Sequence, residues 1–421
     1  MAPDASEAGL TEQDQQILSF IDSRREDLIA LACELIATPS ITPPGDERQV
    51  VALLLKRLPG LGLDGAQVVG PKPERPSLLY RLRGRSGRPT LLYNGHIDTK
   101  PVGEEAARQW RTDPLRPTIL DGRLYGLGSA DMKGAVAAMV YAASALKQIV
   151  PQMEGDLLLA LSADEEGGGS EGAGFLCRGG YIKADFGLIG EPSGVRREWE
   201  YIQLVSRGIC FFRTKVYGTQ MHSSISNILP SVNASVKMAQ VMVRFSRDLT
   251  LSHRPHPLCP FGVTVNPGVM VRGGVFYGVN PGYAEFATDI RVIPGMTLEG
   301  VRRDLEAFLD DLRAEDSDLK VELEFESPQP WIPPTEIAPE NPLVQALVEC
   351  SRAVLGQAPP LGAYPATTDS PKFQLEAGVP TVPSFGPGII TLAHGPNEWV
   401  GVESIVQAAK IYALAARRLL T

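Results

Sequence analysis

The amino-acid sequence predicts an α/β protein with a mostly parallel sheet, helices on both faces of that sheet, and an inserted α+β domain. Short apolar segments, 157–161 and 186–189 among them, alternate with helical patterns, which is typical of parallel strands buried on both faces. Near Gln203 the pattern changes to strands of alternating polarity and amphipathic helices. A proline-rich stretch from Ser327 to Pro334 indicates a return linker. We therefore expect one α/β domain that is split in two by a second domain.

The first part of the α/β domain is expected to occupy residues 1–204. Its first helical pattern ends at Pro39, because proline disfavours helical geometry in the residue before it. Asp131 stands at the start of a long alanine-rich pattern and is expected to open a helix there. The other expected elements are helices over 12–38 and 48–58 and strands over 78–82, 90–93, 157–161 and 186–189.

The insertion is expected to occupy residues 205–326, and the second part of the α/β domain residues 327–421. The order strand, helix, strand, strand, helix, strand within the insertion predicts a ferredoxin-like module. Its expected strands are 210–216, 262–270, 284–292 and 319–325, and its expected helices are 231–245 and 297–312. The final part should contain a helix from Pro342, a strand over 382–385 and a helix from Val402.

Composition excludes several classes of partner. The chain has 421 residues, a formal net charge of −9 and a pI of about 5.3, which disfavours nucleic acid and anionic membranes as partners. No apolar segment reaches the length of roughly 18–20 residues that a membrane span needs. The first residues contain no apolar signal region, and the five cysteines are scattered. We expect a cytoplasmic protein with reduced thiols.

Imidazole and carboxylate side chains follow predicted strands or stand in glycine-rich turns. In open α/β sheets, ligands bind outside the carboxyl ends of the strands. Two imidazoles and three carboxylates suit a pair of divalent ions such as zinc, and this set predicts metal-assisted hydrolysis. The five candidate metal ligands are His96, Asp131, Glu166, Glu191 and His394.

Two further acids accompany these candidates. Asp98 is two residues from His96, so in an extended chain the two side chains share one side, and Asp98 would hold the His96 ring in one tautomer. Glu165 is adjacent to Glu166, and adjacent carboxylates point in different directions, so one can bind a metal while the other faces the metal-bound water as a base. Taken singly, His-x-Asp also fits a solvated turn, and Asp131 also fits a helix cap.

The sequence also contains a motif of a rival enzyme class and three histidines outside the candidate ligand set. Residues 168–172 read Gly-Gly-Ser-Glu-Gly and match the nucleophile elbow of serine hydrolases, but Ser170 does not directly follow a predicted strand. His222, inside the insertion, cannot be assigned to the metal site from its local sequence, and a surface histidine is the alternative. His253 and His256 stand in a proline-rich loop and are expected to be structural.

Six motifs together carry a resemblance to a known family. They are Gly-His-x-Asp, Gly-x-Gly-Ser-x-Asp-Met-Lys-Gly, Asp-Glu-Glu-Gly, Gly-Glu-Pro, Gly-x-x-x-His-Ser and a late Ala-His. With these motifs the chain resembles the metallohydrolase and metallopeptidase family of acetylornithine deacetylase, succinyl-diaminopimelate desuccinylase, aminoacylase-1 and carboxypeptidase G. The likeness extends from Pro39 to the final helix. It implies a zinc-exopeptidase-like fold.

The resemblance also implies which residue binds which metal ion and which residues assist catalysis. Two divalent metal ions would be bound, with zinc as the first expectation and cobalt or manganese as alternatives. Asp131 would bridge the ions, His96 and Glu191 would complete one site, and Glu166 and His394 the other. In the same comparison Glu165 corresponds to the general base, and Asp98 to the support of His96.

The resemblance further implies a homodimer formed through the insertion. His222 would then reach the partner's active site and stabilise an oxyanion, while Arg291, Asn280 and Gly388 would contact the substrate. The expected reaction is hydrolysis of the amide C–N bond of an N-acyl amino acid or short peptide that bears a carboxylate. Carbamoyl removal or deamination of a small carboxylate-bearing substrate is the alternative, and an inactive binding module on the same fold is a second one. Every ligand type is present, which disfavours the inactive module.

Overall fold

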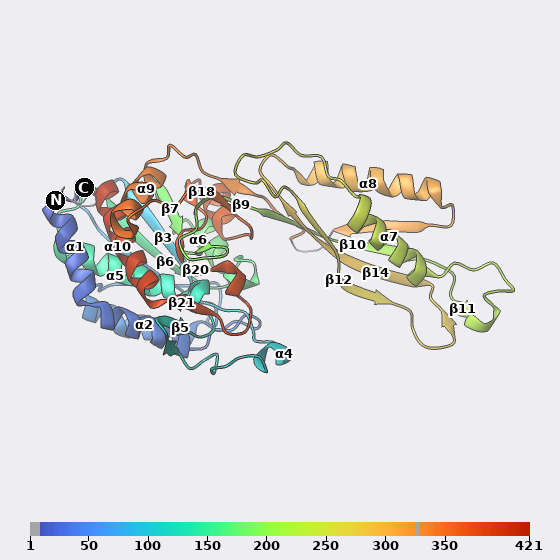
Figure 1. Ribbon diagram of the computed structural model, residues 1–421, viewed down its shortest axis with the longest axis horizontal. Helices are drawn as coiled ribbons and strands as arrows, with labels where there is room; N and C mark the ends of the chain where they lie inside the picture. Colours follow the sequence, from blue (N-terminus) through green and yellow to red (C-terminus); the bar gives the residue numbers. More distant parts are fainter. Residues whose placement is uncertain (1–8, 326–328) are drawn as a thin grey trace. The chain divides into compact units, whose positions relative to one another are not determined.

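The computed structural model describes residues 9–325 and 329–421 and divides into two compact units (Figure 1). The α/β unit comprises the described residues of Met1–Ser206, Glu336–Tyr364 and Thr368–Thr421. The insertion unit comprises those of Arg207–Thr335 together with Pro365–Thr367. The expected boundary between residues 326 and 327, and the start of the proline-rich linker, lie outside the described residues.

A six-stranded sheet forms the centre of the α/β unit. Its strand order is β1-β2-β6-β3-β7-β19. The four strands from β6 to β19 are parallel to one another, whereas β1 pairs antiparallel with β2, and β2 pairs antiparallel with β6. The mostly parallel sheet expected from the sequence is thus confirmed. The strands are β1 (Gln67–Val69), β2 (Ser77–Leu82), β3 (Thr90–His96), β6 (Asp156–Ser162), β7 (Phe186–Ile189) and β19 (Thr381–Val382).

Burial explains the apolar sequences of the central strands. Every residue of β3 and of β6 is buried, and since alternate residues of a strand face opposite sides, both faces of the sheet are covered. On one face the Tyr93 hydroxyl donates a hydrogen bond to the carbonyl oxygen of Tyr412 at 2.6 Å. On the same face a Cβ at Gly95 would lie 2.9 Å from a methyl of Val136, which belongs to helix α5 (Gly134–Ile149). Glycine at this position therefore permits α5 to approach β3 closely.

The helices of the α/β unit pack as the alanine-rich pattern predicts. Helix α5 is buried from Gly134 to Leu146 and packs against α1, α2 and α10, which Figure 1 shows beside one another. The single helix expected over 12–38 is broken at Arg24, and the helix expected to open at Asp131 begins at Gly134, after an irregular turn (Ser129–Lys133). The helices are α1 (Glu12–Ser23), α2 (Arg25–Ala37), α3 (Arg48–Arg57), α4 (Glu104–Ala107), α5 (Gly134–Ile149), α6 (Ala173–Arg178), α9 (Pro342–Leu355) and α10 (Val402–Leu420). Within the described ranges, no helix is long and apolar enough to cross a membrane.

Small sheets connect segments of the α/β unit that are distant in sequence. The orders are β17-β9-β18, β20-β8 and β21-β5-β4. Because β18, β20 and β21 follow the insertion and their partners precede it, these pairs join the two parts of the unit. The strands are β4 (Thr118–Leu120), β5 (Arg123–Tyr125), β8 (Pro192–Gly194), β9 (Ile202–Ser206), β17 (Thr335–Glu336), β18 (Leu361–Tyr364), β20 (Gly386–Ile389) and β21 (Trp399–Gly401).

The insertion unit has the expected ferredoxin-like topology. Its antiparallel strands have the order β12-β14-β10-β15, and β16 also pairs with β10. Helix α7 packs on this sheet, and Phe212, Phe245 and Phe286 form part of the buried core. The elements are β10 (Gly208–Tyr217), β11 (Met221–His222), α7 (Ala234–Asp248), β12 (Thr264–Gly273), β13 (Val279–Asn280), β14 (Tyr283–Val292), α8 (Leu298–Glu315), β15 (Lys320–Phe325) and β16 (Trp331–Ile332).

Candidate metal centre

The carboxyl ends of three parallel strands bring most of the candidate ligands to one edge of the sheet. Strand β3 ends at His96, β6 ends just before the turn that holds Glu165 and Glu166, and β7 ends two residues before Glu191. His96 pairs in register with Ser162, the last residue of β6. Because these strands are parallel neighbours, their ends meet at the same edge, as strand-end sites in α/β sheets require.

Asp131 stands between the two imidazoles. Its Oδ1 lies 2.8 Å from Nε2 of His96, and its Oδ2 lies 3.3 Å from Nε2 of His394. The same His394 nitrogen is 3.0 Å from Oε1 of Glu166, and Nε2 of His96 is 3.6 Å from Oε1 of Glu191. The structure therefore gathers the other four candidate ligands around the Asp131 carboxylate.

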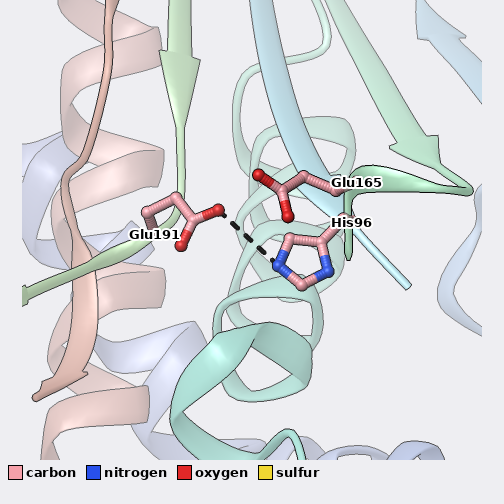
Figure 2. Close-up of side chains that lie close together, drawn as sticks. All are labelled: His96, Glu165 and Glu191. Carbon is pink, nitrogen blue, oxygen red and sulfur yellow. Dashed lines mark ion pairs between the residues drawn. The ribbon is translucent and has the colours of Figure 1, made fainter. Parts of the chain in front are cut away.

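Glu165 lies next to this arrangement. Figure 2 shows its carboxylate beside the His96 ring and the Glu191 carboxylate, with an ion pair marked between the latter two. Potential ligand atoms of His96, Glu165 and Glu191 lie within 4.8 Å of one another, and the same holds for His96, Asp131 and Glu166. Geometry alone thus gives Glu165 access to the space in which an ion and a water molecule would bind.

The backbone and the side chain of Asp98 contact different parts of the centre. Nδ1 of His96 is 3.0 Å from the Asp98 carbonyl oxygen and 3.5 Å from its Oδ1. A hydrogen bond from Nδ1–H to the carbonyl orients the ring so that Nε2 is on the side of Asp131, where its lone pair could bind an ion once its proton is lost. The Asp98 carboxylate accepts hydrogen bonds from the N–H groups of Glu165 and Glu166, each at 3.2 Å. Asp98 therefore holds the turn with the two glutamates as well as the ring.

The electrostatics of the centre fit divalent cations. Burial opposes protonation of His96 and His394, but hydrogen bonds with Asp131 outweigh it, so the pKa of His96 lies well above its usual range and that of His394 is about 10. Burial, and then the negative charge of nearby acids, raises the pKa of Glu165 and of Glu191 well above the ordinary value. Protons here neutralise a buried excess of negative charge, which two divalent ions would do instead. The donor set, imidazole nitrogen and carboxylate oxygen, is the one that zinc accepts.

A buried arginine supports the turn that holds the two glutamates, and the sequence analysis did not identify it. Arg75 is 6% exposed and donates to Oδ1 of Asp164 at 2.6 Å and to Oε1 of Glu47 at 2.5 Å. Asp164, with φ of 65°, also accepts the N–H of Glu171 at 2.8 Å. Arg75 is 89 residues before Asp164, so no local pattern connects them.

Two further residues at the centre were also missed. Lys100 donates to the carbonyl oxygen of Glu166, and its Nζ is 3.4 Å from Oε2 of the same residue. The Tyr364 hydroxyl is 3.3 Å from Oε2 of Glu191 and donates to it. Lys100 stands two residues after Asp98, and this proximity in sequence was the available signal for its position.

Gly388, a candidate substrate contact, is in the α/β unit. It has φ of 100°, in the left-handed region that favours glycine. A Cβ there would lie 2.8 Å from the Cβ of Ala130, the residue before Asp131. The structure thus gives Gly388 a packing role beside the metal centre, and its contact with substrate stays a prediction.

The remaining three candidates, His222, Asn280 and Arg291, belong to the insertion unit. His222 and Asn280 lie on the paired strands β11 and β13, where Met221 is opposite Asn280. Nδ2 of Asn280 donates to the carbonyl oxygen of Thr219 at 2.6 Å, so this amide holds the loop before His222. Arg291, on β14, forms an ion pair with Asp289 at 2.9 Å.

The ring of His222 has a defined hydrogen-bonding state. The side chain is exposed, and its Nδ1 accepts the N–H of Ser224 at 3.2 Å. The Ser224 hydroxyl is 2.8 Å from the same nitrogen. Because Nδ1 acts as an acceptor, the proton of the neutral ring is on Nε2, which faces away from these partners as a donor.

Comparison with known proteins identifies the family. The sequence model described as Peptidase family M20/M25/M40 matches residues 92–418. The chain belongs to this M20 family. Its motifs had indicated such a resemblance, which is now confirmed.

Curated relatives of this M20 protein are named as hydrolases of C–N bonds. This chain is 30% identical over 401 residues to the succinyl-diaminopimelate desuccinylase of Nitrosomonas eutropha, and the alignment covers 93% of this chain and 98% of the relative. It is 26% identical over 427 residues to the N-formyl-4-amino-5-aminomethyl-2-methylpyrimidine deformylase of Bacillus subtilis, covering 94% and 96%. The M20 protein is therefore an enzyme, a metal-dependent amide hydrolase.

Solved structures support the fold. Human carnosine dipeptidase 1 superposes with a TM-score of 0.74 at 18% identity, over 97% of this chain and 99% of that one. An M20 family metallo-carboxypeptidase from Sulfolobus solfataricus gives a TM-score of 0.73 at 19% identity, over 93% and 98%. These matches confirm the expected fold class.

Proposed function

We propose that this M20 enzyme hydrolyses the amide C–N bond of an N-acyl amino acid or short peptide with a free carboxylate. The observation that carries the proposal is the convergence of two imidazoles and two further carboxylates around Asp131, with Glu165 directly beside them. We propose that His96 and Glu191 hold one ion, that Glu166 and His394 hold the other, and that Asp131 contacts both. Zinc is the first choice, and cobalt or manganese would suit the same donors.

Glu165 is the proposed general base. Divalent ions bound here would lower the pKa of water and polarise the substrate carbonyl. Glu165 takes a proton from the attacking water and later gives it to the departing amine, so that the C–N bond breaks as the amine is protonated. Asp98 supports this step, because its carboxylate holds the backbone N–H of Glu165.

The insertion unit supplies the other proposed contacts. We propose a homodimer formed through this unit, in which the Nε2–H group of His222 of the partner subunit donates a hydrogen bond to the oxyanion of the tetrahedral intermediate. The exposed ring and its acceptor role at Nδ1 support this assignment. Arg291 is proposed to pair with the substrate carboxylate, and Asn280 to contact the reacting carbonyl. From the α/β unit, Gly388 is proposed to contact the substrate through its own backbone.

The acyl group is the open part of the proposal. One relative is a desuccinylase and another is a deformylase, so a substrate panel should contain N-succinyl, N-acetyl and N-formyl amino acids, dipeptides and N-carbamoyl amino acids. Preferential turnover of an N-acyl amino acid or a dipeptide supports amide hydrolysis of this substrate class. Turnover restricted to carbamoyl substrates would replace it with the alternative C–N reaction.

The role of Glu165 is tested by Glu165→Gln. This change keeps the shape of the side chain and removes the proton acceptor, so kcat should fall by about 10²- to 10⁴-fold. Metal content, measured by elemental analysis, should stay at the wild-type value. Glu403→Gln is the control, because Glu403 is an exposed glutamate that pairs with Arg25 and not with the candidate ligands. Wild-type turnover in Glu165→Gln would refute the assignment.

A further inference from the structure

Glu398 is a buried glutamate that the proposed chemistry does not use. Its side chain is 1% exposed, and it follows His394 by four residues. Its carboxylate accepts three backbone hydrogen bonds from a single loop. The donors are the N–H groups of Gly128 at 3.1 Å, Ala130 at 2.8 Å and Asp131 at 3.1 Å.

These hydrogen bonds hold a loop that secondary structure does not hold. Gly128 has φ of 76°, and Asp131 has φ of −124° and ψ of 88°, so neither residue is in a right-handed helix. Buried N–H groups need acceptors, and those of Ala130 and Asp131 find theirs on Glu398. Glu398 therefore fixes the backbone from which the Asp131 side chain extends.

The turn that contains Glu398 is itself anchored. Oδ1 of Asn397 accepts the N–H of Arg111 at 2.7 Å, and its Nδ2 donates to the carbonyl oxygen of Gln109 at 2.9 Å. The carbonyl oxygen of Glu398 also accepts the N–H of Gly126 at 3.1 Å. The loop with Asp131 and the turn with His394 are thus joined through one side chain, although they are more than 260 residues apart in sequence.

We propose that Glu398 is the positioning residue of Asp131 and thereby sets the affinity of the enzyme for both metal ions. This inference rests on the two-ion centre of the proposed function. Asp131 stands between His96 and His394, so a shift of its backbone changes both ion sites together. Glu398 acts through the backbone, because N–H groups occupy both of its carboxylate oxygens.

The test is Glu398→Gln. The amide keeps one acceptor oxygen but presents an NH₂ group to N–H donors, so at least one of the three hydrogen bonds is lost. Metal-free protein is titrated with Zn²⁺ in competition with a chromophoric chelator, which gives affinity and stoichiometry without a substrate. The affinity for each of the two ions should fall about 10- to 100-fold, the usual effect of losing an outer partner of a metal ligand.

Asp156→Asn is the matched control. Asp156 is 4% exposed, accepts the N–H of Gly84 at 2.7 Å and pairs with Arg81. It is the first residue of β6, whereas the metal centre is at the other end of that strand. Its replacement should lower the stability of the metal-free protein and leave Zn²⁺ affinity unchanged. A general loss of stability is thereby separated from a specific effect on the metal centre.

Wild-type affinity for two ions in Glu398→Gln would overturn the inference, and so would a loss confined to one ion. Should Glu398→Gln not fold, Glu398→Asp, which keeps the charge on a shorter side chain, is titrated in the same way and judged by the same two outcomes. Asp131→Ala is measured in parallel. If that variant binds two ions as the wild type does, the metal centre of the proposed function is refuted, which is a different failure from that of Glu398 alone.

Discussion

Replacement of Arg75 by methionine tests how the glutamate turn is supported. The guanidinium group donates to Thr42 at 3.0 Å, to Glu47 at 2.5 Å, to Asp164 at 2.6 Å and to Glu171 at 3.3 Å. Glu47 is 0% exposed and Asp164 is 3% exposed, so Arg75→Met leaves two buried carboxylates without their cation. Removing one partner from a buried ion pair costs about 3–5 kcal/mol. We expect the free energy of unfolding of the metal-free enzyme to fall by about that amount at pH 7.

The loss should depend on pH with a definite sign. Burial, and then the charge of Asp98, raises the pKa of Glu47 from 4.5 to about 7, while Arg75 opposes the rise. In the wild type, ionisation of folded Glu47 therefore lowers stability between pH 4.5 and about 7, and the contribution is constant above that. Without Arg75 the pKa rises further, so the variant continues to lose stability above pH 7. The difference between the two proteins should widen from pH 7 to pH 9.

Urea unfolding of both metal-free proteins at pH 6, 7, 8 and 9, followed by tryptophan fluorescence, measures the difference. Arg48→Met is the control, because Arg48 pairs with Asp46 at the surface and its loss should have a small and pH-independent effect. The double variant Arg75→Met with Glu47→Gln should lose the part of the pH dependence that belongs to Glu47. A difference that stays constant or narrows above pH 7 would refute this reasoning.

Two further variants test other charged contacts. Lys100→Met removes a cation from beside Glu166 and should strengthen Zn²⁺ binding roughly twofold to fivefold, as expected for a partly exposed ion pair; weaker binding in the chelator competition would contradict this. Asp14→Asn should lower the free energy of unfolding at pH 7 by about 3–5 kcal/mol, because Arg417 then loses a buried partner that it contacts at 2.7 and 2.8 Å. Burial opposes ionisation of Asp14, but hydrogen bonds from Thr11 and Arg417 outweigh it and lower its pKa below 3.8, so this stability is present above pH 3.8 and is lost as the pH falls through the lowered pKa. Urea midpoints of the wild type and Asp14→Asn should therefore converge only in strong acid, and equal midpoints at pH 7 would argue against the ion pair.

The sequence predicted elements whose signals are local. Asn341 and Thr297 cap α9 and α8 through their side chains, and the expected starts of both helices were within one residue of those found. The ligand positions were recognisable because each acid or histidine follows an apolar strand or stands in a glycine-rich turn. The strand order places three of these ends at one edge, which a sequence pattern can suggest through the parallel-sheet rule.

Other features had no local signal. The break at Arg24 contains neither proline nor glycine, and it arises where α1 and α2 pack separately on α5. Strands such as β8 and β20 are three and four residues long, too short for an alternating pattern. Arg75 and Glu398 act on residues far away in the chain, so their partners become visible only when the fold brings those segments together.

The interruption of the α/β unit affects the order in which a newly made chain can fold. Strands β3, β6 and β7 precede the insertion, whereas β19, α10 and the ligand His394 follow it. During synthesis the first part leaves the ribosome before α10 exists, so the side of α5 that α10 covers stays exposed until the last segment is translated. The insertion unit is almost continuous in sequence, so it can fold during translation, before the last segment is made. The nascent first part therefore exposes apolar surface that the complete enzyme buries beneath α10.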